Sequence, residues 1–329
     1  MQTLVVLLVK SLVLLLGLIT AAALLTLVER KFLGYFQYRL GPNRVGPWGL
    51  FQPIADVVKA AFKEDIIPQD ADRLVFRLAP VLSVFVGLGT FALIPLGPPV
   101  HIGGLTIPLS GAEPNAGILV FLAIASLSVY GVAMGGWASQ SKYSLLGSLR
   151  ATAQMISYEL ALGMALVSVI VTTGTLVPAE MVAYQAQHLP LVLMQPFAFL
   201  IVFISLLAEG NRIPFDLTEA ETELVGGYNT EYTGMRFAMF FLTEYVAVVV
   251  SAALMTTLFL GGWNGPFLPG LLWFFLKTAL MIFVVIWIRA TLPRLRYDQL
   301  MSFGWKVLLP VAALNLLATS ILVVIGWIA

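Results

Sequence analysis

The sequence predicts an all-α, polytopic membrane protein. Of its 329 residues, 60% are hydrophobic and only 11% are charged. Apolar runs recur along the whole chain, each close to the length of about 20 residues that a helix needs to cross a hydrocarbon core. No internal repeat and no low-complexity linker divides the chain. We therefore predict a single membrane domain over residues 1–329.

Eight segments are predicted to span the membrane, with the glycines and prolines that membrane helices tolerate. They cover residues 4–28, 75–96, 116–137, 153–176, 191–208, 237–260, 271–290 and 307–328. The first apolar run begins almost at the N-terminus and has no small-residue cleavage site, so we expect it to be retained as a span.

The basic residues predict which loops face the cytoplasm. Loops one, three, five and seven, with the helix ends beside them, hold 16 of the 18 lysines and arginines. The opposite side carries Lys10, and Lys277 lies within the seventh span. By the positive-inside rule, the basic loops are cytoplasmic and both termini lie outside. We expect a multi-pass protein of the bacterial plasma (inner) membrane.

The first loop contains a predicted amphipathic helix at residues 52–63. One face of this helix is apolar and the opposite face is charged. The apolar face holds Ile54, Val57, Val58, Ala61 and Phe62, and the charged face holds Asp56, Lys59 and Lys63. The segment is too short to span, so it either lies in the membrane interface or covers other spans.

Two predicted spans contain a glutamate, and a third glutamate ends another span. Glu159 and Glu244 lie within spans four and six, and Glu209 follows span five. An ionisable group inside a membrane costs at least about 2.5 kcal/mol, so such groups are rare and usually functional. A buried carboxyl can carry protons, or it can hold helices together through a hydrogen bond. The outer halves of the spans contain no comparable acid.

An acidic loop follows the fifth span. Within the stretch AEGNRIPFDLTEAETELVGGYNTEY, four closely spaced carboxylates follow Pro214, namely Asp216, Glu219, Glu221 and Glu223, and Glu231 comes later in the same stretch. Such a loop can act as an electrostatic element, or it can be a solvated acidic loop. Carboxylate clusters also bind Mg²⁺. The irregular spacing and the lack of a second aspartate-rich motif disfavour a metal site, and we predict none.

The sequence contains few residues that could bind a redox group. It contains no cysteine, which excludes thiolate-ligated iron–sulfur clusters within this chain. Its two histidines, His101 and His188, follow no haem-binding pattern. We expect no covalently bound or metal-ligated cofactor, so any electron transfer must involve partner subunits or a diffusible substrate.

Several long segments resemble one family, the H subunit (mitochondrial subunit-1 counterpart) of the proton-pumping NADH:quinone oxidoreductase, respiratory complex I. The segments are LVERKFLGYFQYRLGPNRVGPWGLFQPIADVVKAAFKED, SKYSLLGSLRATAQMISYELALG, the acidic stretch quoted above, and WIRATLPRLRYDQLMSFGWKVLLP. The resemblance covers nearly the whole chain, and it implies a subunit that forms the membrane entrance of a quinone chamber and couples quinone reduction to proton translocation.

The resemblance also assigns residues to roles. It places Glu29, Arg30, Asp56 and Arg289 along the quinone tunnel, and the amphipathic helix at the tunnel entrance. It places Glu159, Glu209 and Glu244 on a buried proton path. It places Asp216, Glu219, Glu221, Glu223 and Glu231 in an acidic coupling loop beneath the quinone site.

Ser126 is a departure, because some members of the family carry a glutamate there. A path that requires that carboxylate is therefore in doubt for this chain.

The expected partners are quinone, membrane lipid, hydrophilic quinone-site subunits and membrane-arm subunits, and no nucleic acid. Two alternatives stay open at this point. The chain could belong to a related complex fed by ferredoxin, reduced deazaflavin or hydrogen, although GPNRVGP and KED favour a quinone enzyme. It could also be a stand-alone secondary transporter, which predicts an inverted repeat and interrupted helices.

Overall fold

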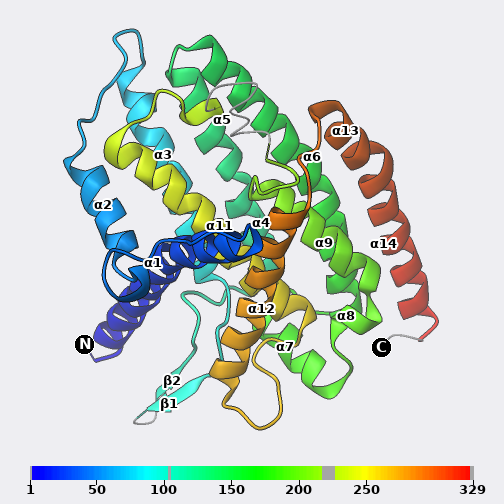
Figure 1. The fold of residues 1–329 in the computed structure, drawn as a ribbon. Helices are drawn as coiled ribbons and strands as arrows, with labels where there is room; N and C mark the ends of the chain where they lie inside the picture. Colours follow the sequence, from blue (N-terminus) through cyan, green and yellow to red (C-terminus); the bar gives the residue numbers. More distant parts are fainter. Residues whose placement is uncertain (1, 103–104, 217–226, 327–329) are drawn as a thin grey trace.

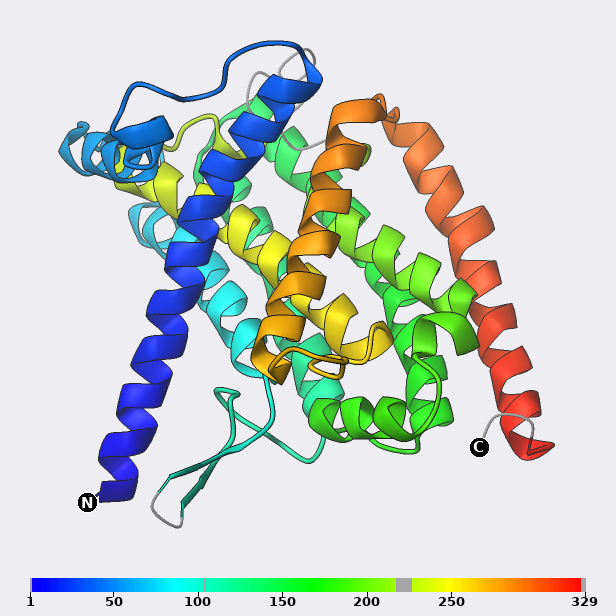
Figure 2. The same ribbon diagram turned by 60° about the horizontal axis from the view of Figure 1, so that its bottom comes forward.

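The computed structural model describes residues 2–102, 105–216 and 227–326 of the chain. Within these residues the fold is a bundle of long helices that run between two ends of the molecule (Figure 1). Figure 2 shows the start of α1, the β1–β2 hairpin and the end of α14 at one end, which we call the outer end. The α1–α2 and α12–α13 connections lie at the other, inner end.

The helices and strands have the following bounds: α1 Gln2–Phe36, η1 Pro47–Gly49, α2 Gln52–Phe62, α3 Arg73–Ala92, β1 Val100–Ile102, β2 Leu105–Ile107, α4 Gly117–Ser126, α5 Ser128–Ala138, α6 Lys142–Thr173, α7 Pro178–Gln187, α8 Leu191–Met194, α9 Pro196–Glu209, η2 Gly227–Asn229, α11 Gly234–Phe259, α12 Gly270–Thr291, α13 Tyr297–Phe303, η3 Gly304–Leu308 and α14 Leu309–Val324.

The polytopic, all-α prediction is confirmed. Seven helices in the described part of the chain are long and apolar enough to cross a membrane. One of them is α4 and α5 taken together, which are separated by a break at Leu127. The predicted fifth span is divided into the four-residue α8 and the 14-residue α9. At 1.5 Å per residue α9 is about 21 Å long, so the eighth crossing stays a prediction.

The helix predicted in the first loop is confirmed as α2. It packs against α1 and α11 at the inner end of the bundle, with Pro53 buried. Ile54, Val58 and Phe62 are exposed, whereas Asp56 faces a cavity between the three helices. The helix therefore covers other spans while presenting apolar side chains outward.

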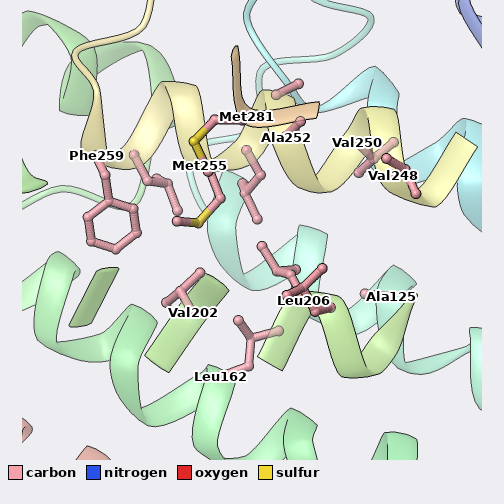
Figure 3. Close-up of a cluster of buried hydrophobic side chains, with 14 of the residues drawn as sticks. Ala125, Leu162, Val202, Leu206, Val248, Val250, Ala252, Met255, Phe259 and Met281 are labelled. Atoms are coloured by element: carbon pink, nitrogen blue, oxygen red, sulfur yellow. The ribbon is translucent and has the colours of Figure 1, made fainter. Parts of the chain in front are cut away.

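The main core lies between α11 on one side and α6 and α9 on the other (Figure 3). Leu162 of α6 and Leu206 of α9 point towards Met255 of α11 in this layer. Lipid tails are as apolar as leucine, so close van der Waals packing rather than exclusion of water favours such contacts in a membrane. A second core cluster joins α3, α5 and the segment before α11.

Small residues allow the backbone to approach closely where α6 meets the end of the acidic loop. A Cβ atom added at Gly147 of α6 would lie 2.8 Å from Cα of Gly227 in η2. Ser144, one turn earlier, donates a hydrogen bond to the carbonyl of Tyr228 at 3.1 Å. These contacts fix η2, and therefore Tyr228, against α6.

Two elements at the outer end were not predicted. The antiparallel hairpin pairs Val100 with Ile107 and Ile102 with Leu105. The helix α7 begins with Pro178 at its first position, where the missing N–H costs nothing. Both lie between predicted spans, in segments whose periodicity is too short to indicate an element.

Candidate functional site

A cavity of about 710 Å³ opens between α1, α2 and α11 at the inner end. Its volume falls within the range of about 300–1,000 Å³ that is typical of ligand pockets. The walls combine apolar side chains such as Phe237 and Phe241 with polar ones such as Asp56 and Tyr245. Such a lining suits an elongated molecule with a polar head and an apolar tail.

An ion pair holds the rim of this chamber. Arg30 of α1 donates to Asp56 of α2 at 2.7 Å, and Gln52 donates to the other carboxylate oxygen at 2.9 Å. The side chains of Arg30 and Asp56 are 40% and 36% exposed. At this exposure the pair contributes little stability, but it does orient α2 on α1.

A buried cluster of charges around Glu29 lies behind Tyr245, which is part of the chamber wall. Arg212 donates through Nη1 to both Glu29 oxygens, at 3.2 and 3.3 Å, and Arg289 also donates to Glu29. The guanidinium carbon of Arg212 lies 4.5 Å from the centre of the Tyr245 ring. Tyr245 also lines the chamber, so it stands between the chamber and the Glu29 cluster.

Asp216 lies close to the same region. It is 4% exposed, and Arg294 contacts its carboxylate at 3.0 Å. A cavity of about 30 Å³ is lined by Asp216, Arg212, Arg289, Glu244 and Tyr245, among others. The predicted tunnel residues Glu29 and Arg289 and the loop residue Asp216 are therefore brought together.

The other face of α11 borders a cavity of about 90 Å³ inside the bundle. Glu209, Glu244 and Tyr228 line it, and the Tyr228 hydroxyl lies 3.5 Å from a Glu244 oxygen. Oε2 of Glu209, Oδ1 of Asn211 and Oγ of Ser128 are buried without a hydrogen-bond partner among the described residues. A cavity needs a volume of about 10–15 Å³ to hold one water molecule, so this cavity has room for several waters beside these atoms.

Glu159 is half-buried on α6 and does not line this cavity. It lies close enough to Glu209 for their negative charges to repel one another. The structure therefore places the three predicted proton-path glutamates in one region, with Glu209 between Glu159 and the cavity.

Two tyrosine hydroxyls near the site hydrogen-bond to the backbone. Tyr158, beside Glu159, donates to the carbonyl of Leu300 at 3.0 Å and therefore does not extend the carboxylate path. Tyr232 lines the chamber and contacts the carbonyls of Phe76 and Gly135 at 3.3 and 3.4 Å. Burial raises the pKa of Tyr232, which keeps its phenol protonated at neutral pH.

Part of the predicted acidic loop lies outside the described residues, namely Glu219, Glu221 and Glu223. Glu231 is half-buried in the turn before α11. Among the residues that the structure describes, no group of three histidine, aspartate or glutamate side chains is placed to hold a metal ion.

Sequence reasoning missed Arg212, Tyr245 and Tyr228. Arg212 was visible as the one arginine of the acidic stretch, but no pattern connects it with Glu29, 183 positions away. Tyr245 directly follows Glu244, and its role depends on which face of α11 meets the chamber. Tyr228 lies 16 positions before its partner Glu244, and no residue pattern indicates that contact.

Comparison with known proteins identifies the family. A family model described as NADH dehydrogenase matches residues 9–320. The chain belongs to this NADH dehydrogenase family. It is 56% identical, over 98% of both chains, to a protein of Symbiobacterium thermophilum that is named as an H subunit, number 1, of NADH-quinone oxidoreductase.

Two further relatives carry the same kind of name. The H subunit of the NADH-quinone oxidoreductase of Syntrophotalea carbinolica is 52% identical over 97% of this chain and 96% of its own. An H subunit of Geobacter sulfurreducens, number 2, is 53% identical over 94% of this chain and 92% of its own. The site of this NADH dehydrogenase family member thus lies in a chain that its relatives match almost end to end.

Proposed function

We propose that this chain forms the quinone-access chamber of an NADH–quinone oxidoreductase and begins its proton path. It is the H subunit of that complex, a multi-pass membrane protein that assembles with other subunits. The 710 Å³ chamber takes the quinone, and electrons reach the quinone from partner subunits. The chain contributes binding and proton handling, with no redox group of its own.

One observation supports this proposal above the others: adjacent residues of α11 line two different cavities. These are the chamber and the 90 Å³ cavity inside the bundle, which we call the inner cavity. Tyr245 lines the chamber and Glu244 lines the inner cavity. Successive residues of a helix point about 100° apart, so one turn can serve both compartments. Arg212 lies beside this turn of α11 and contacts both Glu29 and the Tyr245 ring.

Reduction of a quinone to a neutral quinol consumes two electrons and two protons, so electrons that arrive before the protons place a transient negative charge near the Glu29 cluster. Arg212 and Arg289 share Glu29 as an acceptor, so an added negative charge in the chamber competes for their donors. Glu244 and Glu209 face a cavity with room for water, so they can pass protons onward. We further propose that the basic loops at the inner end face the cytoplasm and that both termini lie outside.

A tryptophan placed at Ala60 tests the chamber. Ala60 lines the chamber from α2, whereas its neighbour Ala61 is exposed and lies outside the lining. Ala60→Trp should lower kcat/KM for quinone at least tenfold while electron transfer from NADH to an artificial acceptor is unchanged. Ala61→Trp serves as the matched control. Equal quinone kinetics in the two variants would contradict the assignment of this cavity.

Glutamine variants test the proton path, because glutamine keeps the size and hydrogen bonds of glutamate but releases no proton. Glu209→Gln or Glu244→Gln should assemble and lose most quinone reductase activity and pumping together. Glu159→Gln is the third test, and Glu→Asp should partly restore activity. Glu180→Gln, at the exposed start of α7, is the control. Near-normal pumping in all three test variants would show that the carboxyls only hold helices together.

A further inference from the structure

We propose that Lys277 seals the outer end of the membrane domain against proton leakage. This half-buried lysine lies within α12, and its ammonium donates to three backbone carbonyls. The acceptors are the carbonyl oxygens of Leu260 at 2.6 Å, Gly262 at 3.1 Å and Asn264 at 2.6 Å. An ammonium has three donors, so all of them are used.

These carbonyls belong to the end of α11 and the turn that follows it. Gln185 of α7 completes the cap, because its amide nitrogen donates to the Thr257 carbonyl at 3.0 Å and its oxygen accepts from the Gly261 amide at 3.0 Å. Bare carbonyls at a helix end would draw water into this part of the membrane. Lys277 and Gln185 remove that possibility by satisfying them.

A dry layer separates this cap from the inner cavity. Along α11, Glu244 and Ser251 line the cavity, and Leu254 and Leu258 follow with 2% and 0% exposure. The space beside Leu254 is lined mainly by apolar side chains and has no room for a water molecule. From Ser251 to Leu260 the helix rises about 13 Å. Thr256 and Thr257 are also buried in this layer, but their hydroxyls donate to carbonyls of the preceding turn. The order along one helix is therefore acid, cavity with room for water, closely packed layer and fixed cation.

The charge of Lys277 strengthens the barrier of this layer. The C-terminal end of a helix carries about half a negative charge, which would attract a proton through the layer. A full positive charge on the cap reverses that sign, in the way that fixed positive charges exclude protons from aquaporin-type pores. A proton on the cavity side of this layer and the Lys277 ammonium are two unit charges about 15 Å apart. At an effective dielectric constant of about 20, their repulsion slows passage of the proton roughly sixfold.

The seal goes beyond the proposed proton path and can be tested without it. The test measures how fast an imposed pH gradient collapses in vesicles that contain the whole complex, with neither NADH nor quinone present. Lys277→Gln keeps two of the three donors and removes the charge. We expect roughly sixfold faster collapse, as calculated above for the lost charge, in Lys277→Gln, and a rate near wild type in Lys277→Arg.

Lys10→Gln is the matched control, because Lys10 is also a lysine near the outer end but lies on α1. An assembled Lys277→Gln complex that leaks at the wild-type rate would overturn the proposal, as would an equal leak in Lys10→Gln. If Lys277→Gln does not assemble, Leu254→Asn tests the same barrier, because a buried amide has more polar groups than one carbonyl of the preceding turn can satisfy and so admits water. Faster gradient collapse in that variant supports the seal, and an unchanged rate refutes it.

Because the leak needs no turnover, it also separates this proposal from the proton path. Loss of pumping in the Glu209 and Glu244 variants concerns only that path, and gradient collapse in the resting complex concerns only the seal.

Discussion

Removing the Glu29 carboxylate should destabilise the protein more than removing either of its arginine partners. The side chains of Glu29 and Arg212 are 5% and 8% exposed, whereas Arg289 is 26% exposed. In Glu29→Gln, Arg289 can turn towards water but Arg212 cannot. Two guanidinium nitrogens of Arg212 already lack a hydrogen-bond partner among the described residues. The variant therefore leaves a buried guanidinium without the carboxylate that it hydrogen-bonds, although Glu244 lies nearby.

The expected magnitude follows from this burial. Breaking a buried ion pair from one side costs about 3–5 kcal/mol. Arg212→Met leaves Glu29 paired with Arg289, so its cost is that of lost charged hydrogen bonds, about 1.5–3 kcal/mol. With an unfolding entropy of about 2.1 cal/mol/K per residue over 329 residues, each kcal/mol shifts the midpoint by roughly 1.5 °C. We expect shifts of about 4–7 °C for Glu29→Gln and about 2–4 °C for Arg212→Met.

The assay is heat inactivation of quinone reductase activity in membranes, with all variants heated at one rate. Electron transfer from NADH to an artificial acceptor reports whether partner subunits survive. The double variant Glu29→Met with Arg212→Met should recover part of the loss, because an apolar pair often replaces a buried ion pair at no cost. If Arg212→Met proves less stable than Glu29→Gln, the charge assignment in this cluster is refuted.

Two further predictions concern packing and orientation. Gly147→Ala should force α6 and Gly227 apart and cost about 1–3 kcal/mol, measured as a lower inactivation temperature, whereas Gly163→Ala, with no atom within 4 Å of the added Cβ, should not destabilise the protein. Equal effects would show that the contact at Gly147 is unimportant. Single cysteines in this cysteine-free chain should report the sides of the membrane: Gln69→Cys should react only from the cytoplasm and Leu268→Cys only from outside. Reaction from the opposite side would reverse the topology.

The fold class could be predicted because hydrophobic length is a local signal. Most predicted spans match a helix to within a few residues, as at 237–260 against Gly234–Phe259. The break at Leu127 and the divided fifth span could not be predicted, because hydropathy does not record where a helix stops within an apolar run.

The site was predicted in part. Glu29 and Arg289 could be named individually, but 260 positions separate them in the sequence, and their contact depends on how α1 and α12 pack. Arg212 had no predicted role because its partner lies on another helix. The two cavities arise from the shapes of several helices together, and no residue pattern indicates them.

The cap on α11 has a mechanical consequence. The outer end of this helix is attached to α7 and α12 through Gln185 and Lys277, whereas its inner end follows the turn that contains Tyr232. The inner end is fixed as well, because Arg236 contacts Asp65 at 3.1 Å and the Thr233 hydroxyl accepts from the Ile66 amide at 3.1 Å. Tyr245 and Glu244 therefore lie on a helix that is held at both ends. A change of charge in the quinone chamber would reach the 90 Å³ cavity through side chains of α11, with little movement of the helix itself.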